Sequence, residues 1–213
     1  MRVLIAGATG LVGKELVKLC HEKDIKVHYL TTSKSKIKDF ENYKGFYWDP
    51  SKGVIDPKAF ENITAVINLA GASISNRWTA ANQKEIYSSR IDSANLIYET
   101  LSSHTNLVTH YISASAVGIY PPSYTAMYTE DSDVVDDSFL GNVVKDWEAA
   151  ANQFKELGMR VATIRTGVVL DEEEGAFPKL VQPIKMGVGS PLGSGKQWRS
   201  WLHIQDVAEV YMH

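Results

Sequence analysis

The sequence predicts an α/β fold in which a parallel sheet carries helices on both faces. Short apolar runs alternate along the chain with longer helical patterns, and this alternation is typical of parallel sheets. The 213 residues suffice for one sizeable domain and not clearly for two. Hydrophobic residues make up 44% of the chain, which is enough for a buried core and argues against disorder.

Each predicted element has its own local signal. Strands are predicted where apolar runs are bounded by turn residues, and helices where apolar residues recur at helical spacing. The predicted strands are residues 2–6, 26–31, 45–48, 64–71, 107–115, 160–170 and 200–204. The predicted helices are residues 11–20, 79–103, 142–157, 180–185 and 205–213.

A glycine-rich turn directly follows the first predicted strand and opens the first helix as G-x-x-G-x-x-G. In this context the glycines permit a tight turn, a close approach of the backbone to a pyrophosphate, and close packing of the helix on the strand. The helix N-terminus adds free N–H groups for phosphate. The turn therefore predicts a dinucleotide site; the alternative is a turn that needs glycine for geometry alone. The predicted ligands here are Gly7, Thr9, Gly10, Leu11, Val12 and Gly13.

Further motifs follow the later strands. The sequence reads NLAG at 68–71, SASAVGIY at 113–120, WEAA at 147–150, RTGVVL at 165–170 and SWLHIQDVA at 200–208. With the glycine turn, they resemble the extended, epimerase-like branch of the short-chain dehydrogenase/reductase superfamily, and most of all its epimerase family or cell-division-inhibitor-like proteins. The resemblance covers the whole chain and implies a Rossmann-like doubly wound parallel sheet.

The resemblance also implies a division of the chain. Residues 1–170 would form the NAD(P)-binding Rossmann domain, and residues 171–213 part of a substrate-binding region that returns to this core. The chain stops at His213 inside a helical pattern that has no stop signal. We therefore expect a truncated chain with a partial C-terminal substrate-binding lobe.

The segment after the second strand favours NADP(H) over NAD. A carboxylate there would bind the ribose diol of NAD and repel a 2′-phosphate, whereas this segment reads TTSKSK and its first acid is Asp39. NAD stays possible, because a lysine-rich surface loop would look the same. Ser33 and Lys34 are the best phosphate candidates, and Asp49 fits an adenine contact or a turn before Pro50. The later predicted cofactor ligands are Thr31, Thr32, Ser33, Lys34, Asp49, Asn68, Leu69, Ala70, Gly71 and Ser113.

The superfamily's acid/base pair is missing from this sequence. The resemblance implies a tyrosine, a lysine four residues later that lowers its pKa, and a serine on the fifth strand. Ser115 matches the serine best and Ser113 second, although either also suits a strand end. No Tyr-x-x-x-Lys occurs, and Gly141 stands four residues before Lys145, which we expect in solvent. We therefore predict Ser115 and Tyr120 as the catalytic residues, with Tyr124, Tyr128 and His203 as the other candidate proton donors and half-buried aromatic packing as the alternative for Tyr120.

Several cationic and aromatic residues are expected near the same sheet edge. They suit an anionic or aromatic substrate, and the alternative for each arginine is a surface salt bridge. His203 is expected first to have a structural role next to the site. The predicted substrate residues are Arg77, Trp78, Arg90, Arg165, Arg199 and His203.

Composition restricts the remaining classes of function. With a net charge of -3, the chain has no excess of basic residues for binding nucleic acid. The single cysteine permits no internal disulfide and fits a reducing cytoplasm, and no signal peptide or membrane span is predicted. The six histidines show no metal-ligand spacing. The two long helices at 79–103 and 142–157 suggest a possible homodimer, with Tyr87, Tyr98 and Trp147 in its interface.

Two functions remain open from the sequence. The first is an NADP(H)-binding oxidoreductase or epimerase-like enzyme that transfers hydride to or from a small carbonyl, hydroxyl or nucleotide-sugar-type substrate. The second is a catalytically silent NADP-binding sensor or scaffold, which the missing tyrosine–lysine pair keeps open.

Overall fold

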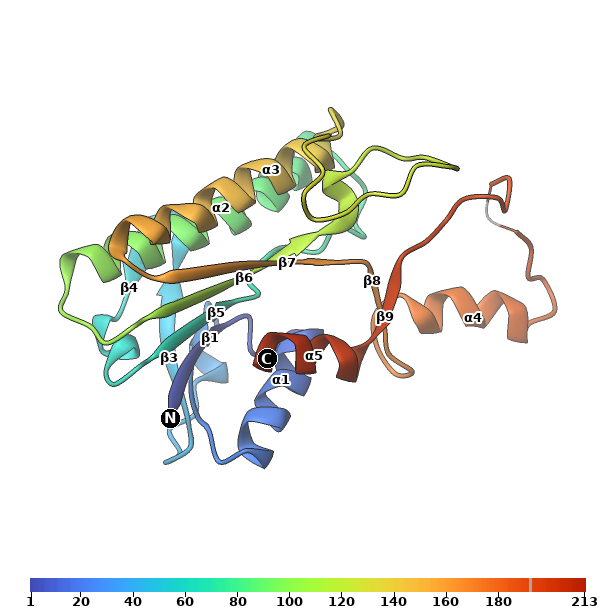
Figure 1. The fold of residues 1–213 in the computed structure, drawn as a ribbon. Helices are drawn as coiled ribbons and strands as arrows, with labels where there is room; N and C mark the ends of the chain where they lie inside the picture. The colour runs from blue at the N-terminus through green and yellow to red at the C-terminus, as the bar shows by residue number, and fades with distance from the viewer. Residues whose placement is uncertain (192) are drawn as a thin grey trace.

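The computed structural model describes residues 1–191 and 193–213; Leu192, in the predicted glycine-rich loop 187–198, lies outside the described residues. A seven-stranded sheet with the order β4-β3-β2-β1-β5-β6-β7 forms the centre of the fold. Its strands pair in parallel except for the antiparallel pair β3–β4. Because the chain starts at the central β1 and moves outward on both sides, the sheet is doubly wound, as predicted (Figure 1). The strands are β1 (Arg2–Ala6), β2 (Lys26–Thr31), β3 (Tyr43–Asp49), β4 (Val54–Ile55), β5 (Ala65–Asn68), β6 (His110–Ala116) and β7 (Arg160–Thr166).

Helices cover both faces of this sheet (Figure 1). One face carries α1 (Leu11–Glu22) and α5 (Ile204–Met212), and the other carries α2 (Ala80–Ser103) and α3 (Phe139–Asn152). The remaining elements are α4 (Phe177–Lys185) and a two-stranded sheet of β8 (Val168–Leu170) and β9 (Trp201–His203). These three elements lie beyond the carboxyl edge of the main sheet (Figure 1).

The sheet buries apolar side chains on both faces because successive residues of a strand point to opposite sides. Val3 and Ile5 pack toward α1 and α5, whereas Leu4 and Ala6 pack toward the α2–α3 side. On the α2–α3 side, the rings of Tyr111 and Phe154 stack at 3.5 Å between centroids. Helix α5 contributes Val207 and Tyr211 to the core beneath α1.

The ends of the two long helices follow local capping chemistry. Thr79 accepts from the N–H of Asn82 at the start of α2, as predicted. Ser138 accepts in the same way from Gly141, so α3 begins three residues earlier than the predicted Asn142. α3 gives way after Asn152 to a 3-10 helix over Gln153–Leu157, and Gly158, with a φ of 75°, ends it.

The predicted strand 160–170 is wrong as a single element. It divides at Gly167, where a Cβ would lie 2.4 Å from the carbonyl oxygen of Ser200. Residues before the glycine pair with β6, and those after it pair with β9 in the second sheet. The two-residue strand β4 was also missed, because it is too short to show alternation.

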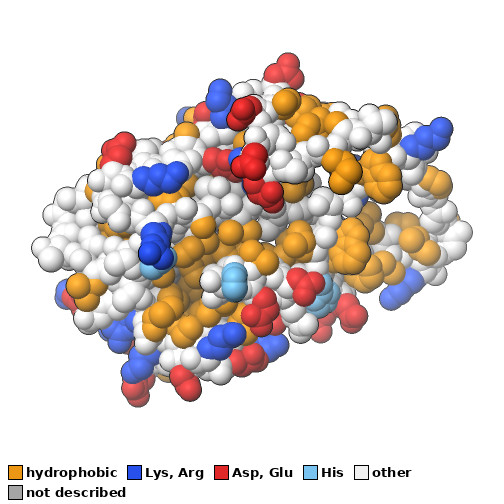
Figure 2. Space-filling view, viewed as in Figure 1, with side chains coloured by type: hydrophobic (Ala, Val, Ile, Leu, Met, Phe, Trp, Pro, Cys, Tyr) orange, Lys and Arg blue, Asp and Glu red, His pale blue; other side chains and the backbone are white. Residues whose placement is uncertain are grey.

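The region around α4 is the part of the chain that packs least. None of the α4 side chains is buried, and Figure 2 shows apolar side chains on the surface in this region. They include Phe177, Leu180 and Ile184. Among the described residues, no helix is both long enough and apolar enough to cross a membrane.

Candidate nucleotide and catalytic site

The glycine turn after β1 leaves no room for side chains. Gly7 has a φ of 86°, and a Cβ there would lie 2.9 Å from the backbone of Leu69. A Cβ at Gly13 would lie 2.2 Å from the carbonyl oxygen of Gly7, so α1 packs directly on the turn. Gly10 precedes α1 without a side-chain cap, and the first turn of this helix has no acidic residue. The N–H groups at this end are therefore available to an anion.

Two clefts adjoin at this turn, because Gly7 and Gly71 line both of them. The first cleft has a volume of about 430 Å³ and the second about 380 Å³. The first includes the end of β2, the end of β3 and the turn after β5, with the predicted residues Thr9, Thr31, Thr32, Ser33, Asp49 and Ala70. The second includes the start of α1, with Gly10, Leu11, Val12, Gly13 and Leu69, and also Ala114 and Thr166. A dinucleotide has this shape, with two nucleoside halves joined at a pyrophosphate.

The segment after β2 presents hydroxyls and a lysine to the first cleft. The Thr31 hydroxyl accepts from the N–H of Ser33 at 3.2 Å. Lys36 lines the cleft, whereas the ammonium of Lys34, the lysine that the sequence favoured, lies 5.0 Å from the ring centre of Tyr47. The structure thus places Lys36 rather than Lys34 along the cleft.

Asp49 at the end of β3 already has local partners. Its carboxylate accepts from the Ser51 hydroxyl at 2.7 Å and pairs with Lys52 at 3.0 Å. These contacts hold its pKa below the usual value. The side chain is therefore an ionised acceptor at the rim of the first cleft, with its negative charge balanced by Lys52.

Two predicted cofactor ligands are buried instead. Asn68 is fully buried; its amide donates to the Tyr111 hydroxyl at 2.9 Å, and its Oδ1 accepts from the N–H of Ala70 at 3.1 Å. Ser113 is also fully buried and donates to the carbonyl of Ala114. Neither side chain lines either of the two clefts. Asn68 instead shapes the turn at 69–71, which lines both clefts.

Four polar side chains from different elements form a cluster at the carboxyl edge of β6 and β7. Arg165 of β7 donates from Nε and Nη2 to the two carboxylate oxygens of Glu148 on α3, each at 2.8 Å. Ser115, its register partner on β6, donates to Glu148 Oε1 at 2.5 Å. Arg165 Nη1 donates to the Tyr120 hydroxyl at 2.6 Å, and this hydroxyl donates to the carbonyl of Thr129. The cluster brings together three predicted residues and adds Glu148.

The charges of this cluster stabilise each other. Burial alone would raise the pKa of Glu148, but the hydrogen bonds from Arg165 and Ser115 outweigh it and hold this pKa below the usual value. The contact with Glu148 in turn raises the pKa of Arg165. The Glu148 and Arg165 side chains retain 12% and 21% exposure, so the ion pair is largely shielded from water.

Gly141 has no room for the missing tyrosine. A Cβ at this position would lie 2.1 Å from the carbonyl oxygen of Asp136. Gly141 is also buried, while Lys145 is exposed as expected. A side chain at 141 would therefore require the chain before α3 to move.

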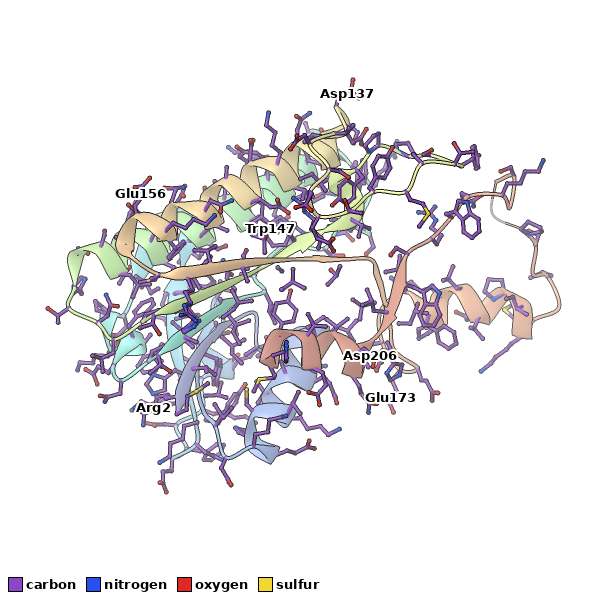
Figure 3. All side chains as sticks on the ribbon, in the orientation of Figure 1. Arg2, Asp137, Trp147, Glu156, Glu173 and Asp206 are labelled. Carbon is purple, nitrogen blue, oxygen red and sulfur yellow. The ribbon has the colours of Figure 1, made fainter. Side chains whose placement is uncertain are left out.

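The guanidinium of Arg90 binds backbone groups of the protein itself. Its guanidinium donates to the carbonyls of Ala72 and Ile86 and lies 5.1 Å from the ring centre of Trp147. Burial lowers the pKa of Arg90. Trp147 is itself buried between α3 and the sheet (Figure 3), so its predicted place in a dimer interface is wrong. Arg90 supports the backbone after β5 rather than facing a substrate.

The other predicted substrate residues are dispersed. Trp78 is 46% exposed and packs edge-on against Phe139 at the start of α3. Arg77 and Arg199 are exposed, and their guanidinium groups have no hydrogen-bond or ion-pair partner among the described residues. His203 precedes α5, and its side chain accepts from the N–H of Gln205 at 3.4 Å. This is a structural role of the kind that we expected first. Only Arg165 joins the cluster.

Glu148 and Lys36 are among the site residues that the sequence analysis did not select. Glu148 gives no local signal, because its partner Arg165 is 17 residues away on β7. Within the described part of the chain, no group of three or more His, Cys, Asp or Glu side chains is placed to hold a metal ion.

The doubly wound sheet, the glycine turn and the paired clefts together define a Rossmann-type dinucleotide-binding protein. Residues 3–213 match the model of the NAD dependent epimerase/dehydratase family, and the chain belongs to this family. It is 37% identical over 209 residues to the epimerase family protein SAR0825 of Staphylococcus aureus, which covers 98% of this chain and 69% of that protein.

Solved structures show the same fold. The human epimerase family protein SDR39U1, solved with NADPH, superimposes with a TM-score of 0.82 at 32% identity, covering 100% of this chain and 69% of the human one. A nucleoside-diphosphate sugar epimerase from Corynebacterium glutamicum also gives a TM-score of 0.82, at 29% identity, covering 100% of this chain and 43% of that protein.

Proposed function

We propose that this protein is an NADP(H)-dependent oxidoreductase or epimerase-like enzyme acting on a small carbonyl, hydroxyl or nucleotide-sugar-type substrate. One observation carries the proposal: two clefts adjoin at an uncapped helix N-terminus, at the same sheet edge as an ionised cluster that contains a tyrosine. The similarity to a human family member solved with NADPH supports the choice of cofactor.

The residues of this chain suit NADP(H). The N-terminus of α1 would bind the pyrophosphate, because its N–H groups have no side-chain cap. Thr31, Thr32, Ser33 and Lys36 would bind the 2′-phosphate through hydroxyls and one cation. Asp49, whose carboxylate accepts hydrogen bonds, would face the adenosine. The bound cofactor supplies a hydride at the nicotinamide.

Tyr120 is our candidate for moving the proton. Its hydroxyl oxygen accepts from Arg165 at 2.6 Å, so a guanidinium would supply the positive charge that the superfamily obtains from a lysine ammonium. This contact would stabilise negative charge that develops on the tyrosine oxygen when its proton leaves. Tyr120 is half-buried, and its proton, which the Thr129 carbonyl accepts in this structure, would be available once the hydroxyl turns to a ligand.

Ser115 would serve a different purpose from the one expected. Ser115 is buried and its proton goes to Glu148, so only the lone pairs of its oxygen would remain for a ligand that reaches it. It therefore suits the hydroxyl hydrogen of a carbinol better than a carbonyl oxygen. Glu148 would act as a positioning residue that fixes both Ser115 and Arg165.

Stopped-flow oxidation of NADPH across a panel of aldehydes, ketones and nucleotide-sugar ketones tests this proposal. We expect turnover with at least one member, and a decrease of about 100-fold or more in Tyr120→Phe and about tenfold or more in Ser115→Ala. Tyr128→Phe is the matched control, since its ring stacks on Tyr120 at 5.1 Å and its hydroxyl has no hydrogen-bond partner among the described residues. Tight NADPH binding without turnover on any compound would favour a silent sensor or scaffold instead.

We also propose a homodimer through the faces of α2 and α3 that point away from the sheet. Tyr87 on α2 is 39% exposed and donates to Asp146 on α3 at 3.0 Å, which fixes the surface that the two helices share. Tyr98 on the same helix donates to Glu156 at 3.1 Å. Light scattering that gives the mass of two chains supports this assembly, and the mass of one chain contradicts it.

A further inference from the structure

Tyr29 places a hydroxyl group inside the apolar core. The residue lies in β2, between β1 and β3, and is fully buried. Its hydroxyl donates to the carbonyl of Lys36 at 2.6 Å and accepts from the N–H of Lys38 at 2.8 Å. Because both contacts are to backbone groups beyond the end of β2, this one oxygen fixes the path of the segment at 36–38.

The neighbouring strand provides the space for this contact. Gly45 of β3 is the register partner of Tyr29. A Cβ at Gly45 would lie 2.5 Å from the ring carbon Cζ of Tyr29 and 2.6 Å from its hydroxyl oxygen. The N–H of Gly45 also donates to the carbonyl of Lys38 at 2.8 Å. The missing side chain at Gly45 therefore lets the tyrosine ring reach the segment.

The tyrosine keeps its proton over the neutral range. Burial raises the pKa of Tyr29, with a smaller opposing effect from the N–H of Lys38. The ring of Tyr43 stacks on Tyr29 at 4.3 Å, and burial raises the pKa of Tyr43 to about 12. The Tyr43 hydroxyl has no hydrogen-bond partner within residues 1–191 and 193–213. The two stacked phenols therefore differ in that only the Tyr29 oxygen holds the backbone.

The segment that Tyr29 holds lies beside the first cleft. Lys36 lines this cleft together with Thr31, Thr32 and Ser33, and no ion pair of Lys36 with a carboxylate occurs among the described residues. Lys34, two residues earlier, is directed to the ring of Tyr47. At the end of β2 the cleft thus has one cation and three hydroxyls, a combination that suits a phosphate group, whereas its carboxylates, Asp49, Glu85 and Asp92, come from β3 and α2.

We infer that Tyr29 is a positioning residue for cofactor selectivity: its hydroxyl holds Lys36 at the cleft so that the lysine binds the 2′-phosphate of NADPH. The inference rests on the proposed function and names the residues that give its preference for NADPH. NADH lacks this phosphate, so loss of the Tyr29 hydroxyl should weaken NADPH binding and leave NADH binding unchanged.

Titration of NADPH and NADH by nicotinamide fluorescence tests this inference in four variants of the full chain. We expect Tyr29→Phe and Lys36→Met each to raise the Kd for NADPH about tenfold while the Kd for NADH stays constant. Tyr43→Phe and Lys34→Met are the matched controls, and both should retain the selectivity of the wild type. An unchanged NADH affinity also shows that Tyr29→Phe still folds, since the variant removes one oxygen and keeps the ring.

The outcomes separate this inference from the proposed function. If the wild type prefers NADPH and Tyr29→Phe retains that preference, or loses affinity for both nucleotides equally, the positioning role of Tyr29 is refuted and the cofactor assignment stands. If Lys34→Met rather than Lys36→Met loses the preference, the phosphate contact is misassigned. A wild type that binds both nucleotides equally refutes the NADP(H) assignment itself.

Discussion

Glu148 shows how a single carboxylate can organise a site. It accepts hydrogen bonds from both Ser115 and Arg165, and Arg165 in turn donates to the Tyr120 hydroxyl. Removing the carboxylate would leave the guanidinium of Arg165 without its partner in a largely shielded position, and this would lower the free energy of unfolding. The cluster should therefore contribute to stability as well as to chemistry.

Glu148→Gln should lower the free energy of unfolding by about 3 kcal/mol at pH 7. The pKa of Glu148 is lowered in the folded state, so its stabilisation is fully present above the unfolded pKa of about 4.3 and is lost as pH falls through the folded pKa. Urea unfolding at pH 7 and at pH 3 measures the difference between variant and wild type, which should shrink at pH 3. A difference that is equal at both values would contradict the charged role of Glu148.

The sequence revealed a site residue only where the residue's role depends on its neighbours in the sequence. The glycines at 7, 10 and 13 were found because strand, turn and helix lie together in the sequence. The choice of Lys34 over Lys36 stays a prediction, although a one-turn 3-10 helix at Lys34–Lys36 directs the first lysine to Tyr47 and leaves Lys36 along the cleft. Glu148 was missed because its role requires the register of β6 with β7 and the packing of α3, which no short stretch of sequence shows.

The close packing of α1 on the turn after β1 depends on Gly13. Gly13→Ala places a Cβ 2.2 Å from the Gly7 carbonyl, a backbone atom that cannot give way easily. We expect a loss of about 3 kcal/mol of unfolding free energy and weaker binding of both NADPH and NADH, because the N-terminus of α1 shifts.

Thermal unfolding and nucleotide titration measure both effects of Gly13→Ala. Gly118→Ala is the matched control, since a Cβ at Gly118 meets nothing within 4 Å, and it should change stability by no more than about 0.5 kcal/mol. Wild-type nucleotide affinity in Gly13→Ala would show that the packing of α1 does not form the site.

The elements themselves were predictable where their patterns are long. Strands β1, β2 and β6 and the helices α1 and α2 were located within a few residues, because buried runs and helical stripes are strong signals. The split of β7 from β8 at Gly167 was not predictable, since it depends on the carbonyl of Ser200, 33 residues away. In the sequence, residues 160–170 form one run that is rich in β-branched residues.

The arrangement of the whole chain places all the candidate chemistry at one edge of the sheet. The glycine turn, the segment after β2, the turn after β5 and the polar cluster between β6 and β7 all follow the carboxyl ends of parallel strands. The sequence predicted this convergence from strand order alone. How far the loops around α4 cover that edge was not predictable, because glycine-rich loops carry no periodic signal.

Calorimetric titration of the wild-type protein with NADPH and with NADH tests the central claim most directly. The structure predicts saturable binding of NADPH, and an affinity for NADH that is lower by about tenfold or more, because the 2′-phosphate loses its cation and hydroxyl partners. Equal affinities, or no saturable binding of either nucleotide, would contradict the account.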